Sequence, residues 1–201
     1  MTPNASFLLS GALAASLPAA AAAADWEIDA AHTTVSFSVK HMMVTTVRGT
    51  FANVAGSVSE DERSPTKSKI DVTIDPASIH TGVVKRDDHL RSADFFDVAK
   101  HPVMTFRSTR VAKAGAGYKV TGDLTMHGVT RPVVLTVDVV TAPIKNPYGQ
   151  TVRGLHATAK INRKDWGLGW NAVLEAGGVA VGESVKLEID AELVAKTAPK
   201  S

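Results

Sequence analysis

The chain has 201 residues, a formal net charge of +2 at pH 7 and no cysteine. The missing cysteine excludes disulfides, thiolate metal sites and cysteine nucleophiles. The 22 basic residues are scattered among 20 acidic ones, a balance that argues against nucleic acid as a partner.

The first 24 residues carry no ionisable side chain and predict a cleaved signal peptide. An apolar run from Phe7 to Leu17 precedes an alanine tract that suits cleavage before Asp25. A single membrane anchor is the alternative, but the run is too short and alanine-rich for the ~20 residues of a span. The basic start of most signal peptides is missing. We expect export to the periplasm, with residues 1–24 as signal peptide and one domain over residues 25–201.

From Asp25 onward apolar and polar residues alternate, as they do in strands with one buried face. The clearest run alternates apolar and mostly charged residues over 185–193, and similar runs begin at Val35, Ile70, Tyr118, Val133 and Leu155. In the run from Val133, the pattern puts Val139 on the inner face and Val140 on the outer one. With 46–58 and 102–111 added, the short connections predict an all-β, eight-stranded antiparallel barrel. A two-sheet sandwich is the alternative.

Two segments break the alternation. Residues 76–101 are expected to form helical turns, with a short helical segment near 83–99, Ser92 as an N-cap and Pro102 as the stop. The second segment, 162–182, is long for a hairpin loop and holds two of the three tryptophans. Both segments could close one end of a barrel.

The predicted barrel is expected to be hollow. Eight-stranded barrels are either filled by their own side chains or hold one small ligand, and many inward positions here are small, among them Ala157, Ala159 and Ala191. The adjacent Phe95 and Phe96 lie in an otherwise polar segment and must cover something apolar. They either seal a ligand cavity or plug the barrel end as ordinary core.

No motif in the chain predicts catalysis or a metal site. The seven histidines include no His-Glu-x-x-His pattern, and no Gly-x-Ser-x-Gly, nucleotide-binding glycine motif or P-loop occurs. One basic cluster, Arg86, His89 and Arg91, could hold the phosphate or carbonyl head group of an amphiphile. The alternative is a solvated helix face with Asp87–Arg91 and Asp88–Arg91 pairs.

Four segments carry a resemblance to a known family: WEIDAAHTTVSFSVKHMMVTTVRGTF at 26–51, KRDDHLRSADFFDVAKHPVMTFRST at 85–109, GDLTMHGVTRPVVL at 122–135 and INRKDWGL at 161–168. The chain resembles the YceI-like family of exported bacterial proteins, which have lipocalin-like barrels that bind polyisoprenoid lipids. The resemblance covers essentially all of residues 25–201. Trp166 is a departure, since the family more often has phenylalanine there.

The resemblance implies a long isoprenoid, of the quinone or prenyl-phosphate type, bound inside the barrel for carriage, storage or sequestration, in some members under stress. It implies no catalytic residue and no cofactor other than the lipid. His127 and Arg163 fall inside family motifs, as turn-stabilising or ligand-contacting residues. Transient membrane contact and a homodimer stay open. The candidate ligand-binding residues are Phe37, Val39, Arg86, His89, Arg91, Phe95, Phe96, Leu124, Leu155, Trp166, Trp170, Leu187 and Ile189.

Two other classes of function remain as alternatives. One is an enzyme that modifies a bound isoprenoid, with His89 as the first candidate for a catalytic group. The other is an interaction module with a solid core and no ligand.

Overall fold

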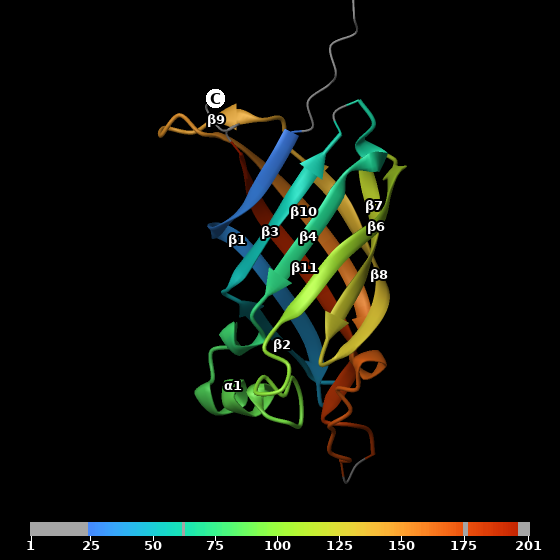
Figure 1. Ribbon diagram of the computed structural model, residues 1–201. Helices are drawn as coiled ribbons and strands as arrows, with labels where there is room; N and C mark the ends of the chain where they lie inside the picture. Colours follow the sequence, from blue (N-terminus) through green and yellow to red (C-terminus); the bar gives the residue numbers. More distant parts are fainter. Residues whose placement is uncertain (1–23, 62, 175–176, 197–201) are drawn as a thin grey trace, which may run out of the picture.

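The computed structural model describes residues 24–61, 63–174 and 177–196 (Figure 1). The predicted signal peptide therefore lies outside the described residues, apart from Ala24. The strands are β1 (Ala24–His41), β2 (Thr45–Phe51), β3 (Val54–Glu60), β4 (Lys69–Ile74), β5 (Ile79–His80), β6 (Met104–Ala114), β7 (Gly117–Met126), β8 (Val129–Val140), β9 (Ile144–Lys145), β10 (Thr151–Asn162) and β11 (Val181–Ala195). The helical elements are α1 (Val84–Arg91) and the 3-10 turns η1 (Pro65–Lys67), η2 (Pro76–Ser78) and η3 (Arg163–Trp166). None of the helices in the described part of the chain has the length and apolar character of a membrane span.

The strands close into a barrel, which confirms the predicted architecture. Antiparallel pairing runs through β1, β3, β4, β6, β7, β8, β10 and β11 and returns to β1 (Figure 1). The closing pair joins β1 to β11, with Phe37 opposite Leu187. At the lower end of the barrel in Figure 1, β2 pairs with β1 in place of β3, and the short β5 pairs with β2. A sandwich is excluded because the ring of pairing is continuous.

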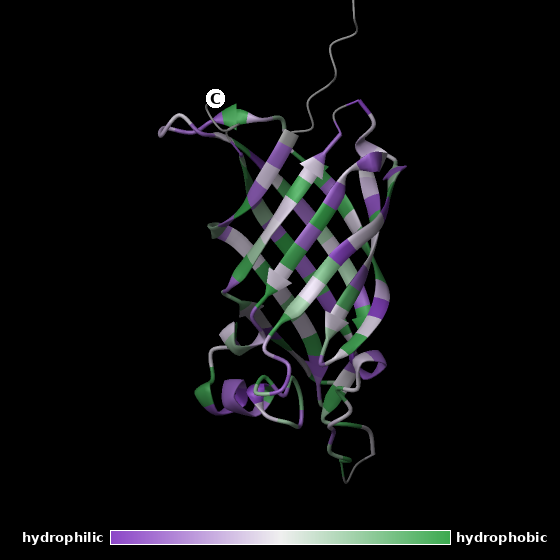
Figure 2. Cartoon of the chain, in the orientation of Figure 1, coloured by the Kyte–Doolittle hydropathy of each residue, from purple (hydrophilic) through white to green (hydrophobic). Residues whose placement is uncertain are grey.

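The alternation predicted for the strands holds along most of the barrel, and Figure 2 shows it as alternating hydrophobic and hydrophilic bands. On β11 the buried Ala191 and Leu193 flank the more exposed Glu192, as the pattern predicts. The prediction is wrong at the end of β8. There Val137 pairs with Ala157 but Val139 pairs with His156, so Asp138 is an extra residue, a β-bulge.

The bulge exchanges the two faces of β8 beyond Val137. As a result Val140, at 39% exposure, lines a cavity at the upper end of the barrel, while Val139, at 49% exposure, lines none of the cavities. The alternation of apolar and polar residues does not reveal a single inserted residue. The prediction therefore placed these two valines on the wrong faces.

The predicted helical segment near 83–99 is only partly helical, and its cap was assigned wrongly. Helix α1 covers eight residues, and Ser92 lies at its C-terminal end, where its backbone N–H donates to the carbonyl of His89 at 3.1 Å. The chain then turns through Asp97, which has a positive φ of 44°. This turn lies at the lower end of the barrel (Figure 1). The segment after η3, residues 167–174 and 177–180, lies at the same end.

Candidate functional site

The centre of the barrel holds an apolar cavity of about 140 Å³. All eight strands of the ring contribute to its wall, whose only polar residue is Thr33. Four of the predicted ligand-binding residues line it, namely Leu124, Leu155, Leu187 and Ile189. The small side chains of Ala157 and Ala191 also face it, as expected for a hollow barrel.

Below the central cavity lies a smaller one of about 90 Å³, and the two share Leu187. Its lining is apolar except for Arg163. Besides Leu187, four predicted residues line it, namely Phe37, Val39, Phe95 and Phe96. The strand residues thus meet the paired phenylalanines at the lower end of the barrel.

The two phenylalanine rings cover the lower cavity. Phe95 is 6% exposed and Phe96 is 9% exposed. Phe96 packs edge-on against Phe51, with ring centroids 5.7 Å apart, and Phe95 lies 5.3 Å from the ring of Trp170. The chain after α1 fixes both rings, because the backbone N–H of Phe96 donates to the carbonyl of Leu90 at 3.0 Å. The rings are part of the core, and neither of them lines the central cavity above them.

Phe95 also separates the lower cavity from a third one, the mouth pocket, of about 190 Å³. The mouth pocket opens between the β1–β2 hairpin, α1 and the segment after η3. Its polar lining is basic, with Lys40, His41, Arg86 and His89, and no carboxylate among the described residues lines it. Trp170 also lines the pocket and packs edge-on against His89, with ring centroids 4.8 Å apart.

A buried carboxylate positions Arg86 at the mouth pocket. Asp87 accepts hydrogen bonds from the backbone N–H of Thr81 at 2.9 Å and from its hydroxyl at 2.5 Å. Burial opposes ionisation of Asp87, but these hydrogen bonds and the nearby His80 and Arg91 outweigh it and hold its pKa below the usual range. Arg86 in turn donates to the hydroxyl of Thr81 at 2.7 Å and to its carbonyl at 2.8 Å. This network presents Arg86 at the pocket wall.

Two of the predicted ligand-binding residues lie elsewhere. Arg91 donates to the carbonyls of Ala77 and Ile79, each at 2.8 Å, and pairs with Asp88 at 3.0 Å. It anchors η2 and β5 and lines none of the cavities described here, so the solvated-pair alternative fits it better than head-group binding. Trp166 is buried, and its indole N–H donates to the carbonyl of Leu124 at 3.0 Å. It closes the barrel from below.

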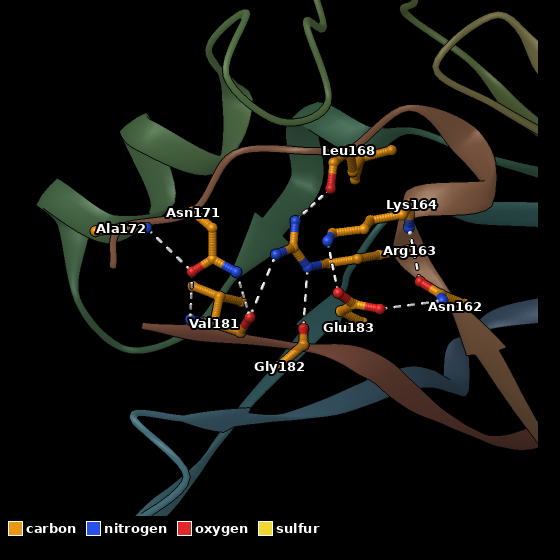
Figure 3. Close-up of polar contacts among 9 residues, drawn as sticks. All are labelled: Asn162, Arg163, Lys164, Leu168, Asn171, Ala172, Val181, Gly182 and Glu183. Carbon is orange, nitrogen blue, oxygen red and sulfur yellow. Dashed lines mark hydrogen bonds and ion pairs between the residues drawn. The ribbon is translucent and has the colours of Figure 1, made fainter. Parts of the chain in front are cut away.

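Arg163 has the turn-stabilising role that the motif suggested, and it also lines a cavity. It lines the lower cavity, and its guanidinium donates to the carbonyls of Leu168, Val181 (3.3 Å) and Gly182 (2.9 Å), as Figure 3 shows. Burial lowers its pKa, against the opposing charge of Glu183. Arg163 therefore holds the segment after η3 against the start of β11. His127 has a related role, since its Nδ1 lies 3.1 Å from the carbonyl of Trp166.

The upper end of the barrel holds residues that the sequence did not reveal. A cavity of about 250 Å³ adjoins the central one and shares Leu155 with it. At its rim Arg153 pairs with Glu60 at 2.6 Å and lies 5.2 Å above the ring of Trp26, whose indole N–H also donates to Glu60. The charges of Arg153 and Glu60 thus offset each other at the rim of this cavity.

Three clusters of histidine and carboxylate side chains have ligand atoms within 4.8 Å of one another in the described part of the chain. None of their members lines the four cavities. Each cluster joins two residues that are close in the sequence with a third from a distant segment, so spacing in the sequence could not indicate the complete sets. The clusters are Asp97 with His101 and His127, Asp29 with His32 and Glu192, and His156 with Glu188 and Asp190.

Replacing Phe95 with Leu should loosen the wall between the lower cavity and the mouth pocket. If the cavities hold the lipid that the sequence resemblance implies, we expect it to exchange into detergent micelles at least about tenfold faster, because such changes act mainly on dissociation. The free energy of unfolding should fall by about 1 kcal/mol, as for most single substitutions. Exchange of a labelled lipid and thermal unfolding measure the two effects. A stability loss with unchanged exchange would show that Phe95 is core alone.

Comparisons with known proteins agree with the fold and the sequence motifs. The YceI-like domain model matches residues 26–193. The chain is 41% identical over 150 residues to YceI of Escherichia coli O157:H7, covering 74% of this chain and 78% of that protein. It is also 41% identical over 148 residues to a UPF0312 protein of Photorhabdus laumondii, covering 73% of this chain and 77% of that protein.

Solved structures share the barrel. Burkholderia cenocepacia BcnA superposes with a TM-score of 0.71 at 25% identity, over 82% of this chain and 98% of that one. A polyisoprenoid-binding domain from Saccharophagus degradans superposes with a TM-score of 0.60 at 18% identity, over 85% and 98%, a likeness of fold alone. With the matched domain model and the relatives at 41% identity, the chain belongs to the YceI-like family.

Proposed function

We propose that the protein binds a long isoprenoid lipid in the periplasm, with the tail inside the barrel. The observation that carries the proposal is the central cavity, whose wall is apolar apart from Thr33. A wall of this kind offers nothing to a polar ligand, while each buried methylene of a tail contributes roughly 0.8 kcal/mol. The solved barrel of the same fold described as polyisoprenoid-binding agrees with this ligand class.

The head group would lie in the mouth pocket. Lys40, His41, Arg86 and His89 line it, and although Asp94 pairs with His89 from outside the lining, no carboxylate lines the pocket itself. Such a lining suits a phosphate or a carbonyl oxygen. At the upper end, in contrast, Arg153 is already neutralised by Glu60. Tail length and head group, rather than chain chemistry, would then select the lipid, and carriage, storage or sequestration would follow from slow release past Phe95.

Binding without turnover is the form of the proposal that the site favours. The candidate for an enzymatic group, His89, is in contact with Asp94 at 2.8 Å and packs against Phe95 and Trp170. This arrangement places an imidazole at the pocket wall, and the other ionisable side chains of the lining, among the described residues, are the basic Lys40, His41 and Arg86. An enzyme would release a chemically altered lipid.

Mass spectrometry of organic extracts tests the proposal. The protein purified from a periplasmic extract should yield an intact isoprenoid, and incubation with that lipid should leave it unchanged. Extracts that contain no lipid above the level of an unrelated periplasmic protein would contradict binding. A product that accumulates with time would contradict binding without turnover.

A further inference from the structure

The lower end of the barrel exposes apolar side chains around the mouth pocket. Met42, Met43 and Val44, in the hairpin between β1 and β2, are 44%, 63% and 85% exposed. Val173, in the segment after η3, is 86% exposed. Figure 1 places the hairpin and this segment at the same end of the barrel. Contiguous exposed apolar groups of this kind mark an interaction surface more often than chance solvent exposure does.

The hairpin keeps these residues against the preference of its own backbone. Met42 and Met43 both have left-handed φ angles, 51° and 59°, and the N–H of Val44 donates to the carbonyl of His41 at 3.1 Å. His41 pairs with Thr45, so the loop has three residues, and its first two positions have the left-handed φ angles that favour Asn and Gly. Methionine is unfavourable at these positions in two ways, because its side chain disfavours a left-handed φ and because it exposes apolar surface to water. Such a break with local rules is expected where function requires it.

The exposed groups belong to one surface. The backbone N–H of Met42 donates to the carbonyl of Ala180 at 2.8 Å, and Val173 forms a β-bridge with Val179. The hairpin and the segment after η3 are therefore held side by side. Both also contribute to the mouth pocket, through His41 and Trp170.

The charges around this surface are complementary to an anionic layer. Lys40, His41, Arg86 and His89 line the mouth pocket, and Lys85 is exposed on α1. The carboxylates of α1 and the turn after it face inward or are paired: Asp87 is buried, Asp88 pairs with Arg91 and Asp94 with His89. Apolar tips beside basic groups suit the boundary between lipid head groups and acyl chains.

We propose that Met42, Met43, Val44 and Val173, here called the docking rim, insert into the surface of an anionic lipid bilayer. The mouth pocket would then open directly onto the membrane that supplies or receives the lipid. This inference rests on the proposed function for its purpose, but its test does not depend on a bound isoprenoid.

Co-sedimentation with vesicles tests the docking rim. We compare phosphatidylcholine vesicles with and without phosphatidylglycerol, using the unmodified protein and the double variant Met42→Asn with Met43→Gly. The variant should bind anionic vesicles at least about tenfold less, because binding scales with buried apolar area. Its unfolding temperature should be equal or higher, since Asn-Gly suits the turn. Val173→Ser should weaken binding independently.

The matched control is Ile144→Ser with Tyr148→Ser. These two residues are 65% and 87% exposed, but they lie at the upper end of the barrel (Figure 1). Their replacement should leave vesicle binding unchanged. Equal losses in both double variants, or an unmodified protein that does not bind anionic vesicles, would overturn the proposal. So would a dimer that disappears in the Met42–Met43 variant, because the rim would then be covered by a second copy.

The two proposals fail in different ways. A protein that carries lipid but ignores vesicles removes the docking rim and leaves the lipid-binding function standing. If the protein binds vesicles through the docking rim but yields no extractable lipid, the docking rim stands and the lipid-binding function is contradicted.

Discussion

Replacing Ala157 with Phe should reduce the lipid that co-purifies with the protein by at least about tenfold, because displacing two methylenes from the cavity already costs that much affinity. Ala157 is 2% exposed and lines the central cavity from β10. A phenyl ring at this position projects into the space that the tail would occupy. Overpacking should cost about 1–3 kcal/mol of folding stability, less than the barrel can tolerate.

The control for this change is Lys160→Phe on the same strand. Lys160 is exposed and points away from the cavity, so the added ring should leave lipid retention unchanged. Quantitative mass spectrometry of extracted lipid and circular dichroism of the barrel give the two readouts. If the folded Ala157→Phe protein retains as much lipid as the Lys160→Phe protein, the tail does not occupy the central cavity.

Replacing Arg163 with Met should produce the largest loss of stability, on the order of 3 kcal/mol or more, because hydrogen bonds to a charged group are worth ~1.5–3 kcal/mol each. Methionine has a similar length and can fill the lower cavity. It leaves the carbonyls of Leu168 and Gly182 without their side-chain donor, whereas the carbonyl of Val181 keeps the hydrogen bond from the Asn171 amide at 2.7 Å (Figure 3). Denaturant unfolding measures the loss.

Arg131→Met is the matched control for Arg163. Arg131 is exposed and donates to a single carbonyl, that of Asp165, at 3.2 Å. Its replacement should change stability by no more than about 0.5 kcal/mol, as for most surface changes. Equal losses for the two arginines would mean that Arg163 does not hold the segment after η3.

Much of the barrel could be predicted because the alternation of apolar and polar residues can be read separately in each strand. The run from Val185 to Leu193 alternates strictly, and the inner positions of β11 follow from it. The bulge at Asp138 could not be predicted, since one extra residue leaves both flanking runs intact and reverses only their relation. The prediction of Ser92 as an N-cap was wrong because serine favours the start of a helix, but the chain after Ser92 forms turns and the helix ends before it.

The site could be predicted in part for a related reason. Phe95, Phe96 and the strand residues were identifiable from adjacency and alternation, and they line the cavities as expected. The upper rim was missed because Arg153 and Glu60 are 93 residues apart and neither breaks the strand pattern. Arg91 was assigned to the ligand with Arg86 because the sequence cannot distinguish an arginine bound to backbone carbonyls from one that faces a pocket.

Electron density inside the barrel tests the central claim most directly. A crystal structure of the protein purified without removal of lipid should contain continuous, tube-like density along the barrel axis, from the mouth pocket past Phe95 to Leu155. Density that ends at the protein's own side chains, with the walls collapsed around Ala157 and Ala191, would show that the interior has no room for a lipid tail.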